Sequence, residues 1–540
     1  MSEKTNMSEK TKKTENKRPL SVHWADINAD KIIREKGEKD HYTCASGVTP
    51  SGTVHIGNFR EIISVELVAR ALRDKGKKSR FIFSWDEYDV FRKVPKNMPE
   101  QELLTTYLRQ PITLVPDTTG ESENYARRNE LAVEAILPAV GVNPEYIYQA
   151  KHYRNSEYAH SIRTALEHKE ELRAMLDEHR TTPLAENWWP VSVFSNFTNK
   201  DTTTVLGWDG EWGVTYRCEE TGKEETVDLR ETSAVKLPWR IDWPMRWAKE
   251  DVDFEPAGKD HHSEGGSFDT AKNTVTVFGG TPPVTFQYDF VRIKGKGGKI
   301  SSSSGEVVSL YDVLEIYPPE IVRYLFVGTR PNSEFAISFD LDVLKIFEDY
   351  DKCERIYYGI QQINEKKKAK ESRIYELSQV NEIPEEISYQ APLRHLCNML
   401  QVHNGNIDAV IAAFPDVKES QLARLRVRCQ CAWNWVRQYA PEDFQFSLQI
   451  EDDELQDLNA SMMACVTDLA AEVENLDKYD EKGMAEVIYR IAHDNDVEPS
   501  NFFTTAYKVL IGKEKGPRLA GFILTCGKEK IVSIFGRYIN

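Results

Sequence analysis

The stretch that decides the fold is YTCASGVTPSGTVHIGN, residues 42–58 of a 540-residue chain. Its first half, YTCASG, is typical of a short strand, and its second half is a turn rich in glycine, serine and threonine. Residues 59–76, FREIISVELVARALRDKG, carry apolar side chains at helical spacing, and RFIFSWDEYD at 80–89 is typical of another strand. The pattern predicts a βαβ unit, the opening of a Rossmann-type parallel α/β sheet.

The remaining sequence predicts an α/β part with an insertion, followed by an all-α part. In the insertion, residues 196–229 read NFTNKDTTTVLGWDGEWGVTYRCEETGKEETVDL and predict short antiparallel strands, and VTFQYDFVRI at 284–293 predicts a further strand. We expect six segments: a disordered tail (1–20), the first half of the Rossmann-type domain (21–120), the insertion (121–231), its second half (232–310), a connecting stem region (311–350) and an α-helical domain (351–540).

Composition excludes several classes of protein. Hydrophobic residues make up 40% of the chain, which excludes a wholly disordered protein. No apolar run is long enough to cross a membrane, which excludes a membrane-spanning protein. The net charge of −17 argues against indiscriminate nucleic-acid binding, DNA included, and leaves room for a local basic surface. The eight cysteines are scattered without any CxxC pair, which favours free thiols in a reducing, cytoplasmic compartment.

The turn at 49–58, TPSGTVHIGN, is the strongest chemical signal. Unpaired backbone N–H groups at the start of the following helix favour an anion there. Ser51, His55 and Asn58 are donors for phosphate oxygens, and Gly57 lets a nucleotide approach the backbone. The alternative is an ordinary helix cap with an incidental histidine.

A second signal is the loop KGKGGKISSSSG at 294–305. Its Lys299 offers a point charge for a triphosphate, and the alternative is a flexible surface linker. Together the two signals resemble the HIGH and KMSKS motifs of class I aminoacyl-tRNA synthetases. Ser302 departs from that pattern, because it stands where the second lysine of KMSKS belongs, although Lys294 and Lys296 lie near in sequence.

The resemblance extends to the archaeal-type class I lysyl-tRNA synthetases. It is carried by SWDEYDVFRKVP, KLPWRIDWPMRWA, VDFEPAGKDH, GGSFDT and the C-terminal GPRLAGFILTCGKEK, and it covers most of residues 20–540. It implies a ligase that converts L-lysine and ATP, with Mg²⁺, to lysyl-adenylate and then transfers lysine to tRNA(Lys), releasing AMP and diphosphate.

Roles for individual residues follow from the same resemblance. The implied catalytic residues are His55, Asn58 and Lys299. The implied ATP-binding residues are Ser51, Gly57, Gly258, Asp260, Lys299, Ser301 and Ser302, with the Asp260 carboxylate accepting the ribose hydroxyls. The implied lysine-binding residues are Gly47, Thr49, Trp239, His261 and Tyr288.

The ε-ammonium group of lysine needs a desolvated carboxylate. Asp86 and Asp242 are the two candidates from the sequence, and either could instead form a structural ion pair. Trp243 and Trp247 fall at helical spacing and are interpreted as core residues.

The insertion departs from the family, whose members carry a zinc ribbon with two CxxC pairs there. Thr221 stands where the second cysteine of the Cys218 pair belongs, and Phe194 and Phe197 stand near the other pair. A single cysteine cannot hold structural zinc, so we expect a ribbon without metal.

The helical half is the expected anticodon reader. Arg424, Arg428 and Trp435 lie in a basic and aromatic run, as unstacked bases and phosphates require. Packing of these residues in a helical core is the alternative.

Three other functions fit the sequence less well. A glutamyl synthetase needs a cation facing its substrate side chain, whereas acids and aromatics surround WRIDW. A small-molecule nucleotidyltransferase of the same superfamily lacks a large helical tail. A non-catalytic RNA-binding protein has no need of His55, Asn58 and Lys299.

Overall fold

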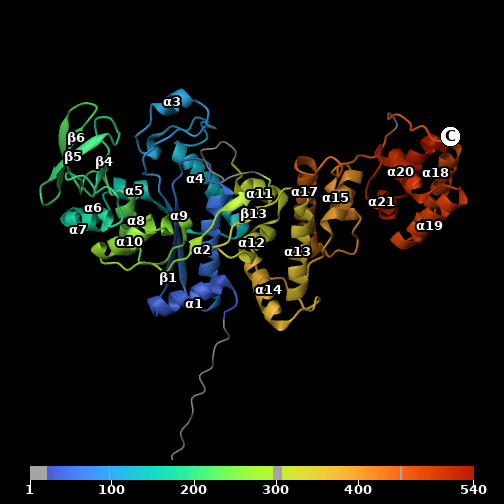
Figure 1. The fold of residues 1–540 in the computed structure, drawn as a ribbon, viewed down its shortest axis with the longest axis horizontal. Coiled ribbons are helices and arrows are strands. Elements are labelled where there is room, and N and C mark those ends of the chain that lie inside the picture. Colours follow the sequence, from blue (N-terminus) through green and yellow to red (C-terminus); the bar gives the residue numbers. More distant parts are fainter. Residues whose placement is uncertain (1–20, 97, 296–306, 451–452, 540) are drawn as a thin grey trace, which may run out of the picture.

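The structure is a computed structural model that describes residues 21–96, 98–295, 307–450 and 453–539 (Figure 1). Strand β1 (Tyr42–Val48), helix α2 (Ile56–Asp74) and strand β2 (Ser79–Trp85) form the predicted βαβ unit. The two strands pair in parallel along their whole length. Helix α1 (Trp24–Lys36) precedes this unit.

Four parallel strands make the central sheet, in the order β3-β2-β1-β9. The outer strands are β3 (Glu145–Tyr148) and β9 (Val252–Phe254). Because all four strands run in one direction, their carboxyl ends meet at one edge, where α/β proteins place their ligands.

The segment predicted as the insertion, residues 121–231, contains helices and a small antiparallel sheet, but it also contains β3, which belongs to the central sheet. Its sheet has the order β5-β6-β7, from β5 (Thr203–Trp208), β6 (Gly213–Cys218) and β7 (Glu224–Asp228). A second antiparallel pair, β4 (Ser192–Val193) with β8 (Val235–Lys236), connects the insertion to the second half of the α/β domain. The helices of the insertion are α4 (Tyr125–Ile136), α5 (Gln149–Arg154), α6 (Ala159–Glu167) and α7 (Lys169–Asp177), and the short helix α3 (Gln101–Thr105) precedes it.

The single strand predicted at 284–293 was wrong, because the structure has two short strands there. Strand β11 (Gln287–Tyr288) pairs with β10 (Ala257–Gly258), and β12 (Val291–Ile293) pairs with β13 (Phe335–Ile337). Asp289 separates the two strands: its backbone N–H donates to the Pro331 carbonyl, and its carboxylate accepts the Phe290 N–H at 2.8 Å. The chain thereby changes partner in the middle of the apolar run.

Between and after these strands the chain is mainly helical. The helices are α8 (Trp239–Lys249), α9 (Lys259–His262), α10 (Ser267–Thr274), α11 (Leu310–Ile316), α12 (Pro319–Gly328), α13 (Asp342–Tyr357), α14 (Glu365–Ser378), α15 (Leu393–Val402), α16 (Ile407–Ala412), α17 (Glu419–Gln438), α18 (Ala460–Val473), α19 (Glu481–Asp494), α20 (Pro499–Ile511), α21 (Leu519–Cys526) and α22 (Lys528–Ile539). Figure 1 shows α18 to α21 at the opposite end of the long axis from β5 and β6.

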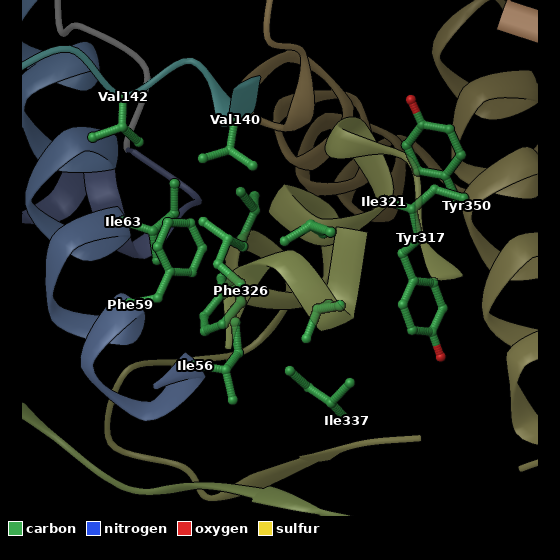
Figure 2. Packing of buried hydrophobic residues seen from close by; sticks show 14 of the residues in the cluster. Ile56, Phe59, Ile63, Val140, Val142, Tyr317, Ile321, Phe326, Ile337 and Tyr350 are labelled. Carbon is green, nitrogen blue, oxygen red and sulfur yellow. The ribbon is translucent and has the colours of Figure 1, made fainter. Parts of the chain in front are cut away.

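One large apolar core runs from α1 and α2 to α17, and α18 to α22 enclose a separate core. Figure 2 shows the first core where α2 meets α12. The Phe59 and Phe326 rings meet edge to face with centroids 5.2 Å apart, and Ile56 and Ile63 are fully buried beside them. At about 1.5–3 kcal/mol for each buried side chain, this packing fixes the helix that starts at the predicted anion site.

Two further observations concern the whole chain. All eight cysteines are buried free thiols. Among the described residues, no helix combines the length and the apolar character needed to cross a bilayer.

Candidate active site

The start of α2 brings His55 and Asn58 together. His55 is the N-cap: its Nδ1 accepts the Asn58 N–H at 3.3 Å, and the Asn58 Oδ1 accepts the His55 N–H at 3.2 Å. A Cβ on Gly57 would lie 2.8 Å from the His55 ring, so only glycine leaves the ring in this position. The reciprocal cap orients both polar side chains at the positive end of the helix dipole.

The turn before α2 is held from the insertion. Tyr125 donates its hydroxyl proton to the Ser51 carbonyl at 3.1 Å, and Asn129 donates to the Pro50 carbonyl at 3.2 Å. The Ser51 side chain is exposed. Helix α4 therefore fixes the shape of this turn.

The chain that follows the second predicted loop contacts the same helix. The Ile56 N–H donates to the Val308 carbonyl at 2.8 Å. Lys299, Ser301 and Ser302 lie outside the described residues. The described part of the segment thus ends against the first turn of α2.

A cavity opens at the carboxyl ends of β1, β2 and β9. It is lined by Gly47, Glu61, Ser84, Asp86, Trp239, Trp243, Arg246, Glu255, Pro256, Ala257 and His261. Of the seven residues predicted to bind lysine, Gly47, Asp86, Trp239 and His261 line it. Thr49, Asp242 and Tyr288 are not part of its lining.

Two lining carboxylates, Glu61 and Glu255, were not predicted from the sequence. Glu61 accepts hydrogen bonds from the Ser46 hydroxyl at 2.8 Å, the Gly47 N–H at 3.2 Å and the Tyr288 hydroxyl. Glu255 accepts from the indole N–H groups of Trp243 and Trp247, at 3.0 and 2.5 Å. Among the described residues neither carboxylate has an ion-pair partner within 4.0 Å.

Burial raises the pKa values of both carboxyl groups. For Glu255, burial and then the nearby Glu61 charge raise the pKa to about 7. For Glu61, burial raises the pKa, although the hydrogen bonds from Tyr288, Ser46 and Gly47 lower it in part. The Tyr288 pKa is raised as well, by burial and by the Glu61 charge. Two adjacent acids that ionise reluctantly create a site for a cationic group.

The two acids named from the sequence are already paired. Arg246 donates to Asp86 at 2.6 Å, and its Nε lies 3.1 Å from the Asp242 carboxylate. Asp242 also accepts the Tyr153 hydroxyl proton. Asp242 lies outside the cavity lining, and Asp86 lines it while neutralising Arg246.

Trp239 lines the cavity and stacks on Trp243 at 4.9 Å between ring centroids. Trp243, which was interpreted as a core residue, lines the cavity as well. The His261 Nδ1 lies 2.5 Å from the Ser267 hydroxyl, and Thr49 donates to Asp89 at 3.3 Å. These contacts fix the orientation of side chains around the cavity.

Gly258 and Asp260 lie beside the cavity at the strand-to-helix turn between β10 and α9. A Cβ on Gly258 would meet the Tyr288 ring at 3.5 Å, and the Asp260 side chain is exposed. Asp260 is thus accessible to a ligand outside the carboxyl end of β10.

The residues expected to contact RNA are engaged inside the helical half. Arg424 pairs with Glu354 at 2.7 Å, and Arg428 pairs with Asp351 at 2.6 Å in a buried position. Trp435 is fully buried and donates to the Phe339 carbonyl at 2.9 Å. Arg428 and Trp435 are thus buried in the helical body, whereas the Arg424 side chain is 29% exposed and held by Glu354.

The ribbon-like section also needs a correction. Ser195 and Thr198, rather than Phe194 and Phe197, stand opposite Cys218: the Thr198 hydroxyl lies 3.9 Å from its Sγ. Phe194 is buried in the core of the insertion, and Phe197 is 39% exposed. The positions opposite Cys218 thus lie one residue after those expected from the sequence.

Comparison with known proteins gives extensive similarities. A family model described as tRNA synthetases class I (K) matches residues 22–381. The chain is 56% identical to a lysine–tRNA ligase of Borreliella burgdorferi over 96% of this chain and 100% of that protein. It is 39% identical to a lysine–tRNA ligase of Thermococcus kodakarensis over 95% and 98% of the two chains. A solved glutamate tRNA ligase from Elizabethkingia meningosepticum is 12% identical with a TM-score of 0.43, covering 93% and 99%.

Proposed function

Because the chain belongs to the lysine group of class I tRNA synthetases and is a lysine–tRNA ligase, we propose that the cavity beside β1 and β2 holds the lysine. The observation that carries this assignment is the charge of the lining. Glu61, Asp86 and Glu255 bring three carboxylates, and Arg246 brings one cation that Asp86 and Asp242 already neutralise. Lysine carries two ammonium groups, and Glu61 and Glu255 are two carboxylates for them.

The same charge balance disfavours a glutamate substrate. A glutamate side chain needs an unpaired cation facing it, and the described lining offers only the neutralised Arg246. The stacked Trp239 and Trp243 suit the methylene chain of lysine, and their ring faces attract an ammonium group.

The start of α2 is the proposed ATP site. The phosphates, carried as the magnesium complex, would lie against the N–H groups and the His55–Asn58 cap, with Ser51 and Gly57 beside them. Asp260 would accept the ribose hydroxyls, next to Gly258. Lys299, with Ser301 and Ser302, would come from the loop that ends at Val308.

Chemistry then needs positioning and charge stabilisation, with no covalent enzyme intermediate. The lysine carboxylate attacks the α-phosphorus, the bond to diphosphate breaks, and Lys299 offsets the charge that develops on the leaving group. A terminal ribose hydroxyl of tRNA then attacks the adenylate carbonyl and AMP leaves. The buried free thiols support a reducing, cytoplasmic location. The acidic net charge supports selective rather than indiscriminate RNA binding.

Norleucine tests the lysine assignment, because it keeps the four-carbon side chain of lysine and lacks only the ammonium group. Calorimetric titration should give binding at least about 100-fold weaker than for lysine, since a buried carboxylate would lose its cation. Equal affinities would contradict the assignment.

The pH dependence of lysine use follows from Glu255. Below its pKa of about 7 the carboxyl group is protonated and cannot pair with ammonium, and above it the carboxylate can. We expect kcat/KM for lysine in ATP–pyrophosphate exchange to rise between about pH 6 and about pH 8. Glu255→Gln should remove this rise, and a flat profile in the unmodified enzyme would contradict the prediction.

For tRNA we propose a groove between α15 and α21, in place of the residues on α17. Its cations are Arg394, Lys513, Lys515 and Arg518, and its acids are Asp443 and Glu481. Among the described residues, Arg394, Lys515 and Arg518 have no carboxylate partner within 4.0 Å. The Arg394 guanidinium lies 5.4 Å from the Phe444 ring centroid, an arrangement that suits a phosphate beside a stacked base.

The double variant Arg394→Ala, Arg518→Ala tests this groove. We expect a higher KM for tRNA and a log–log salt slope shallower by about 1.4, while lysine-dependent exchange stays unchanged. Arg426→Ala, at an exposed arginine of α17 paired with Asp408, is the matched control and should change neither activity.

Arg428→Ala provides the contrast for α17. It leaves Asp351 buried without its cation, so the melting temperature should fall and both activities with it. If this variant instead lost only tRNA affinity and kept a normal melting temperature, α17 would be the tRNA-binding surface.

A further inference from the structure

Two six-residue turns in the insertion have the same hydrogen bonds. They are SNFTNK (Ser195–Lys200) and CEETGK (Cys218–Lys223). In each turn the first N–H donates to the sixth carbonyl, at 2.8 and 2.9 Å, and the fifth N–H donates to the first carbonyl, at 2.7 and 2.8 Å. The sixth N–H donates to the hydroxyl of the fourth residue, at 3.4 and 3.3 Å. Both fifth residues have positive φ, 59° and 67°.

The first and fourth side chains of both turns converge on one sulfur atom. The Thr198 hydroxyl lies 3.9 Å from the Cys218 Sγ, and the Ser195 and Thr221 hydroxyls lie close enough to the sulfur to lower the pKa of the thiol. Burial opposes ionisation of the thiol, but these hydroxyls and the backbone N–H groups of Glu220 and Thr221 outweigh it and lower its pKa to about 7. Four positions therefore meet at one point.

This donor set does not fit the zinc that the family resemblance implies. Zinc takes thiolate, imidazole or carboxylate ligands, whereas three of the four positions carry neutral hydroxyls. Among the described residues, no group of three or more histidine, cysteine or acidic side chains is arranged to hold a metal. The spacing of the four positions, however, is that of two pairs of zinc ligands, each with two residues between them.

We propose that the two turns are a zinc-knuckle pair in which hydrogen bonds to Cys218 replace the metal, and that thiols at the three hydroxyl positions would restore a zinc site. Direct contacts, without a metal, connect the two turns to the catalytic domain. The Phe194 N–H next to the first turn donates to the Ala234 carbonyl at 2.8 Å, and Lys236 then pairs with Asp89 at 2.7 Å. Asp89 also accepts the Thr49 hydroxyl proton, so these contacts connect the turns to Thr49.

The test is the full-length variant Ser195→Cys, Thr198→Cys, Thr221→Cys, purified with Zn²⁺ or Co²⁺. We expect about one zinc per chain and the absorption bands of tetrahedral cobalt thiolate. The matched control is Asn196→Cys, Phe197→Cys, Glu220→Cys, which adds as many thiols to the same turns at exposed positions between the converging ones. It should bind no stoichiometric metal.

The unmodified enzyme keeps the proposal testable if the triple variant fails to fold. It should contain no stoichiometric zinc, and chelators should change neither its melting temperature nor, once Mg²⁺ is restored, its exchange activity. Cys218→Ser, which keeps an acceptor for the three hydroxyls, should melt closer to the unmodified enzyme than Cys218→Ala. The proposal is overturned by a folded triple variant without metal, by a control that binds equally well, or by about one zinc in the unmodified protein.

Discussion

Replacing Glu255 by glutamine should lower kcat/KM for lysine in ATP–pyrophosphate exchange by roughly 10²- to 10³-fold. Glu255 is buried and is held by two indole N–H groups, without an ion-pair partner among the described residues. A lysine ammonium group would be its counter-charge. Breaking a buried ion pair from one side costs about 3–5 kcal/mol, which sets the expected size of the effect.

The control for this variant is Glu264→Gln, at an exposed position of the loop after α9. It should leave exchange and melting temperature unchanged. Norleucine identifies which ammonium group Glu255 holds: if it holds the ε-ammonium, the variant should no longer distinguish lysine from norleucine. Preserved discrimination would assign that group to Glu61 instead, and a normal kcat/KM for lysine would remove Glu255 from the site.

Replacing Lys299 by alanine should lower kcat for adenylate formation by roughly 10²- to 10³-fold, while the KM for ATP changes less. The reason is that a charge stabilising the departing diphosphate acts mainly on the transition state. The motivation is the sequence KISSS and the end of its segment at Val308, which is hydrogen-bonded to the first residue of α2.

Lys294→Ala separates this role from that of a neighbouring lysine. Lys294 forms ion pairs with Asp340, at 2.8 Å, and Asp342. Its replacement should therefore leave exchange nearly normal. Normal exchange in Lys299→Ala would exclude Lys299 from the mechanism and direct attention to Lys294 and Lys296.

The sequence predicted the parts of the fold that depend on local periodicity. Apolar spacing from Phe59 to Leu72 predicted α2, and strand-forming runs on either side predicted β1 and β2. The change of partner at Asp289 was missed, because it depends on a hydrogen bond from its backbone to Pro331, 42 residues later. Local β-propensity contains no information about such a partner.

The acids of the site show the same limit. Sequence alone could not tell that Arg246 pairs with Asp86, which lies 160 residues away from it. The i,i+4 spacing of Asp242 and Arg246 on α8 was a usable signal for their ion pair. One signal was available for Glu255: it directly follows a buried strand, at the edge where parallel sheets bind ligands. Glu61 has no comparable signal, because only the fold brings this helical residue to Gly47 and Tyr288.

The misinterpreted residues on α17 did carry a usable pattern. Leu425, Arg428, Ala432 and Trp435 follow each other at three- and four-residue spacing and form its buried face. The aspartate that makes burial of Arg428 possible stands 77 residues earlier, on α13. A basic and aromatic run on a helix is therefore ambiguous until its counter-charges are located.

The measurement that tests the central claim most directly is ATP–pyrophosphate exchange with the purified enzyme and each of the standard amino acids in turn. A cavity with a neutralised arginine and two carboxylates that have no ion-pair partner in the described part of the chain should support exchange with lysine alone, and glutamate should give none. Exchange driven by glutamate, or no exchange with lysine, would contradict the assignment of Glu61 and Glu255 to a dicationic substrate.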